Sequence, residues 1–194
     1  MTSIIGDVTT DMEISIDTTG NKYGKHVIKQ IDFTPSKNKN NVRLEVADLL
    51  TEPENIINQV PLENNSVIYQ YLDVKLLSDE EYLGETGIDS MTFVFSIEKS
   101  WFENNSINKQ TIQMMRYHND TWNELNTTYY FETSSEVYYL AETPGLSVFA
   151  VVGDQAEQQE QAFTPSTLYI LCLFTLAILL VVSIINKKNA IINN

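Results

Sequence analysis

The sequence of 194 residues contains a single cysteine, Cys172, and only two histidines, His26 and His118. One cysteine excludes an internal disulfide bond and a zinc site built from several thiolates. Two histidines so far apart in the chain offer little for a histidine-based metal site. Basic residues are also few: 12 lysines and arginines against 26 aspartates and glutamates give a net charge of −14. This balance argues against nucleic-acid binding, which needs a cationic surface to displace counterions from phosphate.

Catalytic and nucleotide-binding motifs are missing as well. The sequence has no HExxH, GxSxG, P-loop or GxGxxG pattern. Two acidic clusters, at residues 79–81 and 7–13, lack the spacing of a calcium loop, which wraps oxygen ligands around one ion. We therefore expect solvated acidic loops without a metal or cofactor, and a protein that is not an enzyme.

What the sequence does contain is a long apolar run towards its C-terminal end. No charged residue occurs between Glu160 and Lys187, and residues 168–185, from Leu168 to Ile185, are almost wholly apolar. As a helix this run extends about 27 Å, close to the hydrocarbon thickness of a bilayer. A buried helix of a globular domain would carry a polar stripe, which this run lacks. We therefore expect one C-terminal transmembrane α-helix.

The charges that flank this run predict its orientation. Lys187 and Lys188 follow it directly, whereas the nearest charges before it are acidic. By the positive-inside rule, residues 186–194 form a cytoplasmic tail and the N-terminal domain is extracellular. Residues 154–167 are rich in Gln and Glu, and we expect them to be a solvated linker between the domain and the helix.

Export of such a domain requires a signal that the first residues do not supply. The N-terminal sequence MTSIIGDVTTDMEIS has no basic start and no apolar stretch of the length that a signal peptide needs. We expect the natural N-terminus to lie upstream of Met1. The alternatives are a misassigned start site and a tail-anchored protein whose domain faces the cytoplasm; the charge asymmetry opposes the last of these.

Before the linker, apolar and polar residues alternate with a period of two. This pattern is typical of half-buried strands, and turn-forming residues separate the runs. The alternating apolar positions are Met12, Ile14 and Ile16; Val42, Leu44 and Val46; Ile68, Leu72, Val74 and Leu76; Met91, Phe93, Phe95 and Ile97; Ile112 and Met114; Val137 and Tyr139; and Leu146, Val148, Ala150 and Val152. We expect an all-β domain, an antiparallel β-sandwich of about eight or nine strands over residues 26–153, preceded by an N-terminal strand or extension at residues 1–25.

Two short helical turns are expected to interrupt these strands. Ser100 with Glu103, and Thr51 with Glu54, have the spacing of a capping box, in which each side chain satisfies a backbone donor of the other residue. Both patterns predict that a helix starts at the Ser or Thr residue.

The domain also contains four Asn-x-Ser/Thr sequons, at Asn64, Asn104, Asn119 and Asn126. Each falls in a predicted loop or turn, where an exposed asparagine can accept an N-linked glycan. We expect a glycoprotein.

Several sequence blocks occur in order between His26 and Gly153. They are VIYQYLDV at residues 67–74, Ser-Trp followed by Glu-Asn within 100–104, Met-Arg-Tyr at 115–117, WNELNT at 122–127 and AETPGLSVFAVVG at 141–153. In this order, and with a membrane helix following, they resemble the PGF-pre-PGF domain of archaeal surface proteins. The resemblance implies an S-layer-associated or envelope protein of an archaeon, without catalytic residues. Family members commonly end in a sorting signal with a Pro-Gly-Phe tripeptide, whereas residues 163–166 read Phe-Thr-Pro-Ser, so we expect the helix to be retained.

These predictions describe a single-pass cell-surface module with a structural or adhesive role, whose partners are the lipid bilayer and other envelope or S-layer proteins or glycans. An alternative is a sugar- or peptide-binding module, which predicts an exposed patch among the aromatic residues Trp101, Trp122, Tyr129, Tyr130, Tyr138 and Tyr139. A third hypothesis, a surface hydrolase, requires two converging carboxylates, or a carboxylate and His118, in a cleft.

Overall fold

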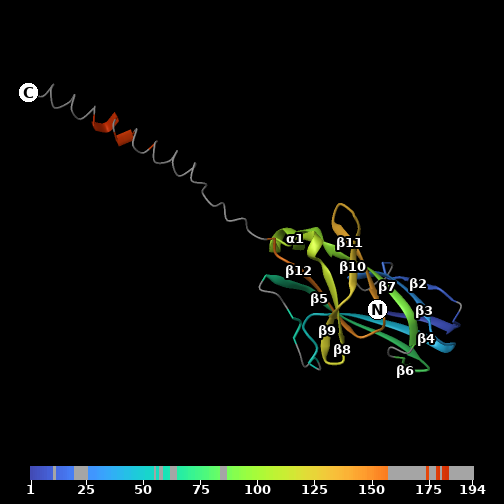
Figure 1. The fold of residues 1–194 in the computed structure, drawn as a ribbon. Helices are drawn as coiled ribbons and strands as arrows, with labels where there is room; N and C mark the ends of the chain where they lie inside the picture. The colour runs from blue at the N-terminus through green and yellow to red at the C-terminus, as the bar shows by residue number, and fades with distance from the viewer. Residues whose placement is uncertain are drawn as a thin grey trace, which may run out of the picture. The chain divides into compact units, whose positions relative to one another are not determined.

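The computed structural model describes residues 1–10, 12–19, 26–54, 56, 59–61, 65–83, 87–156, 174, 178–179 and 181–183. The chain divides into two compact units, Met1–Ala156 and Glu157–Asn194. The first unit is a β-sandwich whose described strand pairs are all antiparallel (Figure 1). The predicted all-β architecture is therefore confirmed.

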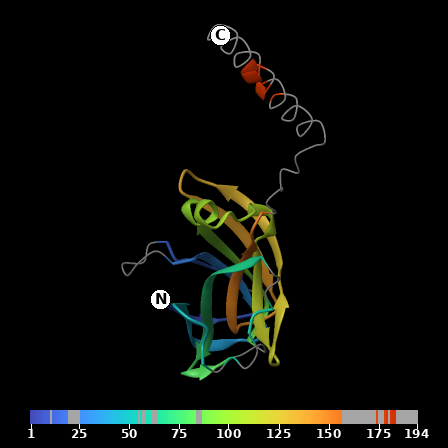
Figure 2. The ribbon, with the colours of Figure 1, turned by 90° about the vertical axis from the view of Figure 1, so that its left-hand side faces the viewer.

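Two sheets form the layers of this sandwich. The seven-stranded sheet has the order β1 (Thr2–Val8), β4 (Lys39–Leu49), β5 (Ser66–Ser78), β12 (Val148–Asp154), β8 (Gln113–His118) and β9 (Thr121–Glu124), and β6 (Glu81–Tyr82) pairs with β5. The five-stranded sheet has the order β10 (Asn126–Glu132), β11 (Glu136–Thr143), β7 (Ile88–Glu98), β3 (Ile28–Pro35) and β2 (Ile14–Asp17). Helix α1 (Lys99–Asn105) lies at one end of the sandwich, near the turn of the β10–β11 hairpin (Figures 1 and 2), and a 3-10 turn, η2 (Lys109–Thr111), precedes β8.

The core lies between the two sheets and is built from the alternating apolar positions. Phe93 and Phe95 on β7 and Val42 and Leu44 on β4 are fully buried, as the period of two predicts. Phe93 meets Phe149 of β12 edge to face across the core, with ring centroids 5.1 Å apart. Such contacts join the inner faces of the two sheets into one apolar cluster, which a sandwich requires.

The sandwich has more strands than the alternation predicts. Twelve strands lie in the described part of the chain, and the additional ones include β9, of four residues, and β6, of two. Strands this short do not complete enough periods to be recognised. Residues 1–25 contribute β1 and β2, which pair with β4 and β3, so these strands belong to the sandwich itself.

Two predicted face assignments are wrong. In the series around β12, Leu146 packs in the core, whereas Val148, Ala150 and Val152 pack on the outer face, and Phe149 and Val151 face the core in their place. Leu72, Val74 and Leu76 face the core as expected, but Ile68 packs on the opposite face of the sheet. The register explains the difference, because Val151 and Val152 of β12 pair with residues 70 and 68 of β5, which leaves an extra residue on β5. Such a bulge exchanges the inward and outward positions along a strand.

The helical turn expected at Ser100 is confirmed as helix α1, but the capping box predicted there is wrong, and so is the helical turn expected at Thr51. Helix α1 starts at Lys99, with Glu98 as its N-cap and no side-chain cap bond, because β7 runs directly into the helix. Ser100 therefore lies inside the helix, where its hydroxyl is 3.5 Å from the Glu98 carboxylate. Residues 51–54 form no helix, and Pro53 disfavours helical geometry in the residue before it.

In the second unit, the described residues 174, 178–179 and 181–183 are helical, and their apolar side chains are exposed. The predicted span ends, Leu168 and Ile185, and the topology residues Lys187 and Lys188 lie outside the described residues. Among the residues that are described, no helix is both long and apolar enough to cross a membrane.

Candidate functional site: an aromatic groove on the five-stranded sheet

The outer face of the five-stranded sheet carries a shallow groove to which all five strands contribute. Its volume is about 420 Å³, and its lining residues are Asp17, Thr19, Lys29, Gln30, Asp32, Val94, Tyr130, Phe131, Tyr138 and Leu140. We call it the aromatic groove, because three aromatic rings form one side of it. Carboxylate and amide side chains from β2 and β3 line the other side.

Two β-bulges bring additional side chains to this face. On β10, Tyr129 and Phe131 pair with consecutive residues of β11, so Tyr130 is the extra residue. On β3, Ile28 and Gln30 pair with consecutive residues of β7, so Lys29 is the extra residue. A bulge changes the direction of neighbouring side chains. As a result, consecutive residues of β10, Tyr130 and Phe131, and of β3, Lys29 and Gln30, line the groove.

The aromatic side of the groove is exposed. Tyr130 retains 54 % and Phe131 41 % of its accessible surface. Phe131 stacks on Tyr138 with centroids 4.3 Å apart and ring planes 12° apart, while Tyr130 meets Phe131 edge to face at 5.0 Å. Large exposed aromatic side chains that gather in one place are typical of binding surfaces.

The polar side of the groove presents oxygen acceptors. The Gln30 amide donates to both carboxylate oxygens of Asp32, at 2.9 and 2.8 Å. Asp17 is exposed and accepts hydrogen bonds from the backbone N–H and the hydroxyl of Thr19. These hydrogen bonds, that of the hydroxyl first, lower the pKa of Asp17 below its usual value. Asp17 is thus an acceptor and lacks the raised pKa of a general acid.

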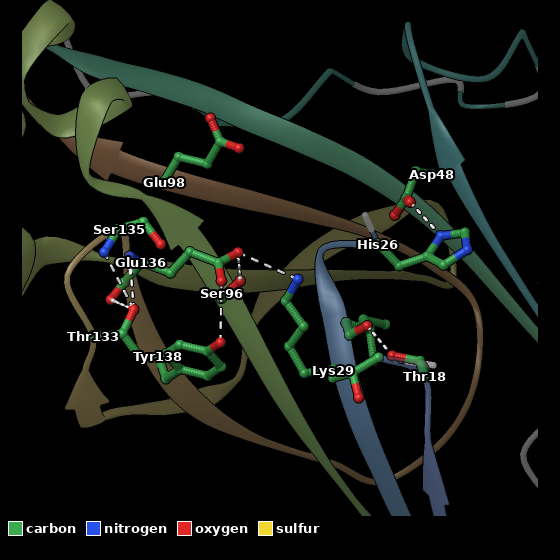
Figure 3. Close-up of polar contacts among 12 residues, drawn as sticks. Thr18, His26, Lys29, Asp48, Ser96, Glu98, Thr133, Ser135, Glu136 and Tyr138 are labelled. Carbon is green, nitrogen blue, oxygen red and sulfur yellow. Dashed lines mark hydrogen bonds and ion pairs between the residues drawn. The ribbon is translucent and has the colours of Figure 1, made fainter. Parts of the chain in front are cut away.

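A buried polar cluster on the same face of the sheet adjoins the groove (Figure 3). Lys29 and Glu136, whose side chains are only 10 % and 11 % exposed, form an ion pair with a distance of 3.3 Å between Nζ and Oε1. The Ser96 hydroxyl donates to the same carboxylate at 3.0 Å, and the Tyr138 hydroxyl donates to its second oxygen at 3.1 Å. Burial raises the pKa of Glu136, but the Ser96 hydrogen bond, the Lys29 charge and the Tyr138 hydrogen bond outweigh it, so the pKa lies below its usual value.

The outer face of the seven-stranded sheet also carries aromatic residues, but they are buried. Trp122 is 9 % exposed and lies with its ring centroid 5.2 Å from that of Tyr117 and 6.2 Å from that of Tyr71. Val60 and Ile56, from the connection between β4 and β5, pack into this cluster and cover it. This aromatic cluster is therefore part of the packed interior of the domain, whereas Lys75 on the same outer face is exposed.

The six aromatic residues predicted to form a binding patch are thus divided. Tyr130 and Tyr138 line the groove, and Tyr129 is 55 % exposed beside the core residue Tyr139. Trp122 is buried, and Trp101 packs edge to face against neighbouring rings near α1. Sequence reasoning missed Phe131 and the carboxylates of the groove. The run of residues 129–131 is a usable signal, because three consecutive aromatic residues cannot all face one side of a regular strand.

Three of the four predicted glycosylation sites are described. Asn104 is exposed on α1, and Asn119 is exposed in the β8–β9 turn with a φ of +50°. Asn126 is exposed at the start of β10, where its amide donates to Glu142 at 3.3 Å. Asn64 lies outside the described residues. The use of these sites stays a prediction.

Of the groups considered for hydrolysis, two carboxylates, Asp17 and Asp32, line the groove, but the histidines lie elsewhere. His118 ends β8 in the other sheet, and His26 pairs with Asp48, with 2.6 Å between Nδ1 and Oδ2 (Figure 3). Within the described ranges, no three His, Cys, Asp or Glu side chains are placed to hold a metal ion.

No protein-family model, curated protein or solved structure matches this chain. The fold and the groove themselves define the class of the domain: an antiparallel β-sandwich with a covered aromatic cluster on one outer face and exposed aromatic rings on the other.

Proposed function

We propose that the protein is a membrane-anchored cell-surface module with a structural or adhesive role, of the PGF-pre-PGF type found in archaeal envelopes. The observation that carries this proposal is that the sequence blocks behind the resemblance meet one another in the fold. Residues 67–74 lie in β5, 115–117 in β8 and 141–153 in β11 and β12, and β12 pairs with both β5 and β8.

Contacts between these blocks are specific. Trp101 of α1 packs against Tyr69 of β5 with centroids 5.0 Å apart, and Trp122 packs against Tyr117. A Cβ atom at Gly153 would lie 2.7 Å from Cδ1 of Ile112, 2.8 Å from Cγ2 of Ile107 and 3.3 Å from the Trp101 ring, so a larger residue would require these side chains to shift. Residues spread over the sequence that pack together in this way support a common structural origin for the blocks.

The proposed anchor is a retained C-terminal helix over residues 168–185, with Lys187 and Lys188 in the cytoplasm. The uncharged run supports it, since its length matches a bilayer. With a single cysteine in the chain, the domain forms its core without an internal disulfide, and its negative charge suits an exposed surface position.

Alkaline carbonate washing of membranes tests the anchor. We expect the full chain to stay in the membrane fraction, and the variant Ile178→Arg/Val182→Arg to be released, because charges at the bilayer centre oppose insertion. Ser183→Ala is the matched control and should stay. Protease added to intact cells should digest the domain and leave the tail protected. Release of the unmodified chain by carbonate would contradict the proposal.

A second candidate function is an extracellular sugar- or peptide-binding module. The exposure of Tyr130 and Phe131 in one groove favours it. Tyrosine nitration followed by mass spectrometry tests it. We expect Tyr130 to be protected in native envelope preparations relative to the purified chain, and Tyr129, of similar exposure, to react equally in both. Equal reactivity of Tyr130 in the two samples would argue against an occupied groove.

A further inference from the structure

We propose that the aromatic groove is a binding site for an uncharged glycan chain. This proposal specifies the ligand class for the second candidate function, and it rests on that function. The groove offers two surfaces that a sugar requires together: aromatic rings, against which the apolar face of a pyranose ring packs, and oxygen acceptors for its hydroxyl groups.

The aromatic surface is held in place before any ligand binds. Tyr138 is fixed by its hydrogen bond to Glu136, which is in turn paired with Lys29 and Ser96. Phe131 stacks on Tyr138, and Tyr130 meets Phe131 edge to face. Groups that are already ordered lose little conformational entropy on binding. Glu136 and Lys29 are thus positioning residues for the platform.

The charges of the groove exclude an anionic ligand. Asp17 and Asp32 face the site, while the ammonium group of Lys29, the cationic residue among the lining side chains, is paired with Glu136. The whole chain carries a net charge of −14. Acidic polysaccharides and phosphorylated ligands would be repelled. A neutral sugar would not be repelled, and its hydroxyl groups can donate hydrogen bonds to the carboxylate oxygens of Asp32 and Asp17.

The position of the groove disfavours an extended peptide. Peptides that join a sheet bind to the free backbone groups of an edge strand. The groove lies on the face of the sheet: its middle is over β3, β7 and β11, which are each paired on both sides, and the edge strands β2 and β10 supply lining side chains. Recognition there depends on side chains alone, as in sheets whose faces bind oligosaccharides.

Binding to the full chain in lipid nanodiscs tests the site by isothermal titration. The neutral probes are hexasaccharides of glucose, mannose and N-acetylglucosamine; hexagalacturonate is the anionic probe and a lysine-rich decapeptide the cationic one. We expect a neutral hexasaccharide to bind, and Tyr130→Ala and Phe131→Ala each to weaken it about tenfold. Tyr129→Ala, on the same strand but outside the groove, should change the affinity less than about twofold. Salt should have little effect on this binding.

Three results would overturn the site: no neutral hexasaccharide binds at millimolar concentration, binding is unaffected by Tyr130→Ala, or only a charged probe binds. Near-ultraviolet circular dichroism establishes that each variant is folded. The carbonate wash on the same variants keeps the two proposals apart. A chain that stays in the membrane but binds no neutral sugar contradicts the glycan site alone, and a chain that binds sugar but is washed off contradicts the anchor alone.

Discussion

The two outer faces of the sandwich both carry aromatic side chains, but these side chains are covered on only one of the two faces. On the seven-stranded sheet, Trp122 is 9 % exposed and clusters with Val60 of the β4–β5 connection. On the five-stranded sheet, Tyr130 is 54 % exposed in an open groove. The same residue class therefore stabilises the fold on one side and is available for binding on the other. What decides between the two roles is the segment that packs on top.

The largest expected effect is that of Trp122→Ala in the covered cluster. Removal of the indole leaves a cavity against Tyr117 and Tyr71, and we expect a loss of about 4 kcal/mol in the free energy of unfolding. Urea unfolding with an unchanged m-value measures it. A loss below about 1 kcal/mol would mean that the connection does not hold this cluster closed.

The second-largest effect on stability is expected for the buried ion pair beside the groove. Glu136→Leu leaves Lys29 buried without its carboxylate, and we expect a loss of about 3 kcal/mol. Lys29→Met/Glu136→Leu removes both charges and should regain most of this stability, because no buried charge remains unpaired. Equal losses in the single and double variants would show that the pair does not act as a unit.

The cover itself is tested by Val60→Ala. Val60 is 6 % exposed in the cluster around Trp122, and we expect a loss of about 1–2 kcal/mol from its truncation. An increase in the reactivity or fluorescence quenching of the tryptophans should accompany it. If quenching stays as in the unmodified chain, Trp122 is shielded by something other than this connection.

A smaller effect concerns pH. In the folded state the pKa of Glu136 is lowered: burial raises it, but the Ser96 hydrogen bond, the Lys29 charge and the Tyr138 hydrogen bond outweigh that. A lowered folded-state pKa adds stability that is present above the unfolded pKa, about 4.3, and is lost as pH falls through the folded pKa. We expect the free energy of unfolding to fall more steeply with acid in the unmodified chain than in Glu136→Gln. Parallel curves would contradict the lowered pKa.

The smallest effect on stability is expected for Tyr130→Ala. The side chain is half exposed and sits at a bulge on an edge strand, so its removal should change the free energy of unfolding by less than about 0.5 kcal/mol. Comparison of this variant with Trp122→Ala distinguishes a residue that stabilises the fold from one that is available for binding. A large loss on unfolding would place Tyr130 with the structural residues.

Much of the sandwich was predictable because the period of two reports which face of a strand is buried. The series on β4 and β7 gives their core residues directly, since these strands remain regular there. The prediction fails where a bulge adds a residue, as at Ile68 on β5, and where strands are as short as β6 and β9. The predicted membrane span falls on residues 168–185 and stays a prediction.

The candidate site was only partly predictable. The sequence supplies the aromatic residues of the hairpin at residues 129–131, but Asp17 and Asp32 reach them only through the pairing of β2, β3, β7, β11 and β10. The pairing of Lys29 with Glu136 joins residues far apart in the chain, and spacing along the chain carries no signal for it.

By itself the sequence determined the composition, the alternation and the charge of this protein, and hence an acidic all-β domain followed by an apolar run. Those properties follow from each residue and its near neighbours, through side-chain direction and solvation. Only the tertiary structure decided on which outer face the aromatic side chains are covered, where the bulges turn the side chains of Tyr130 and Lys29, and which carboxylates face the rings. Those outcomes depend on register and on contacts between distant segments, which no local pattern contains.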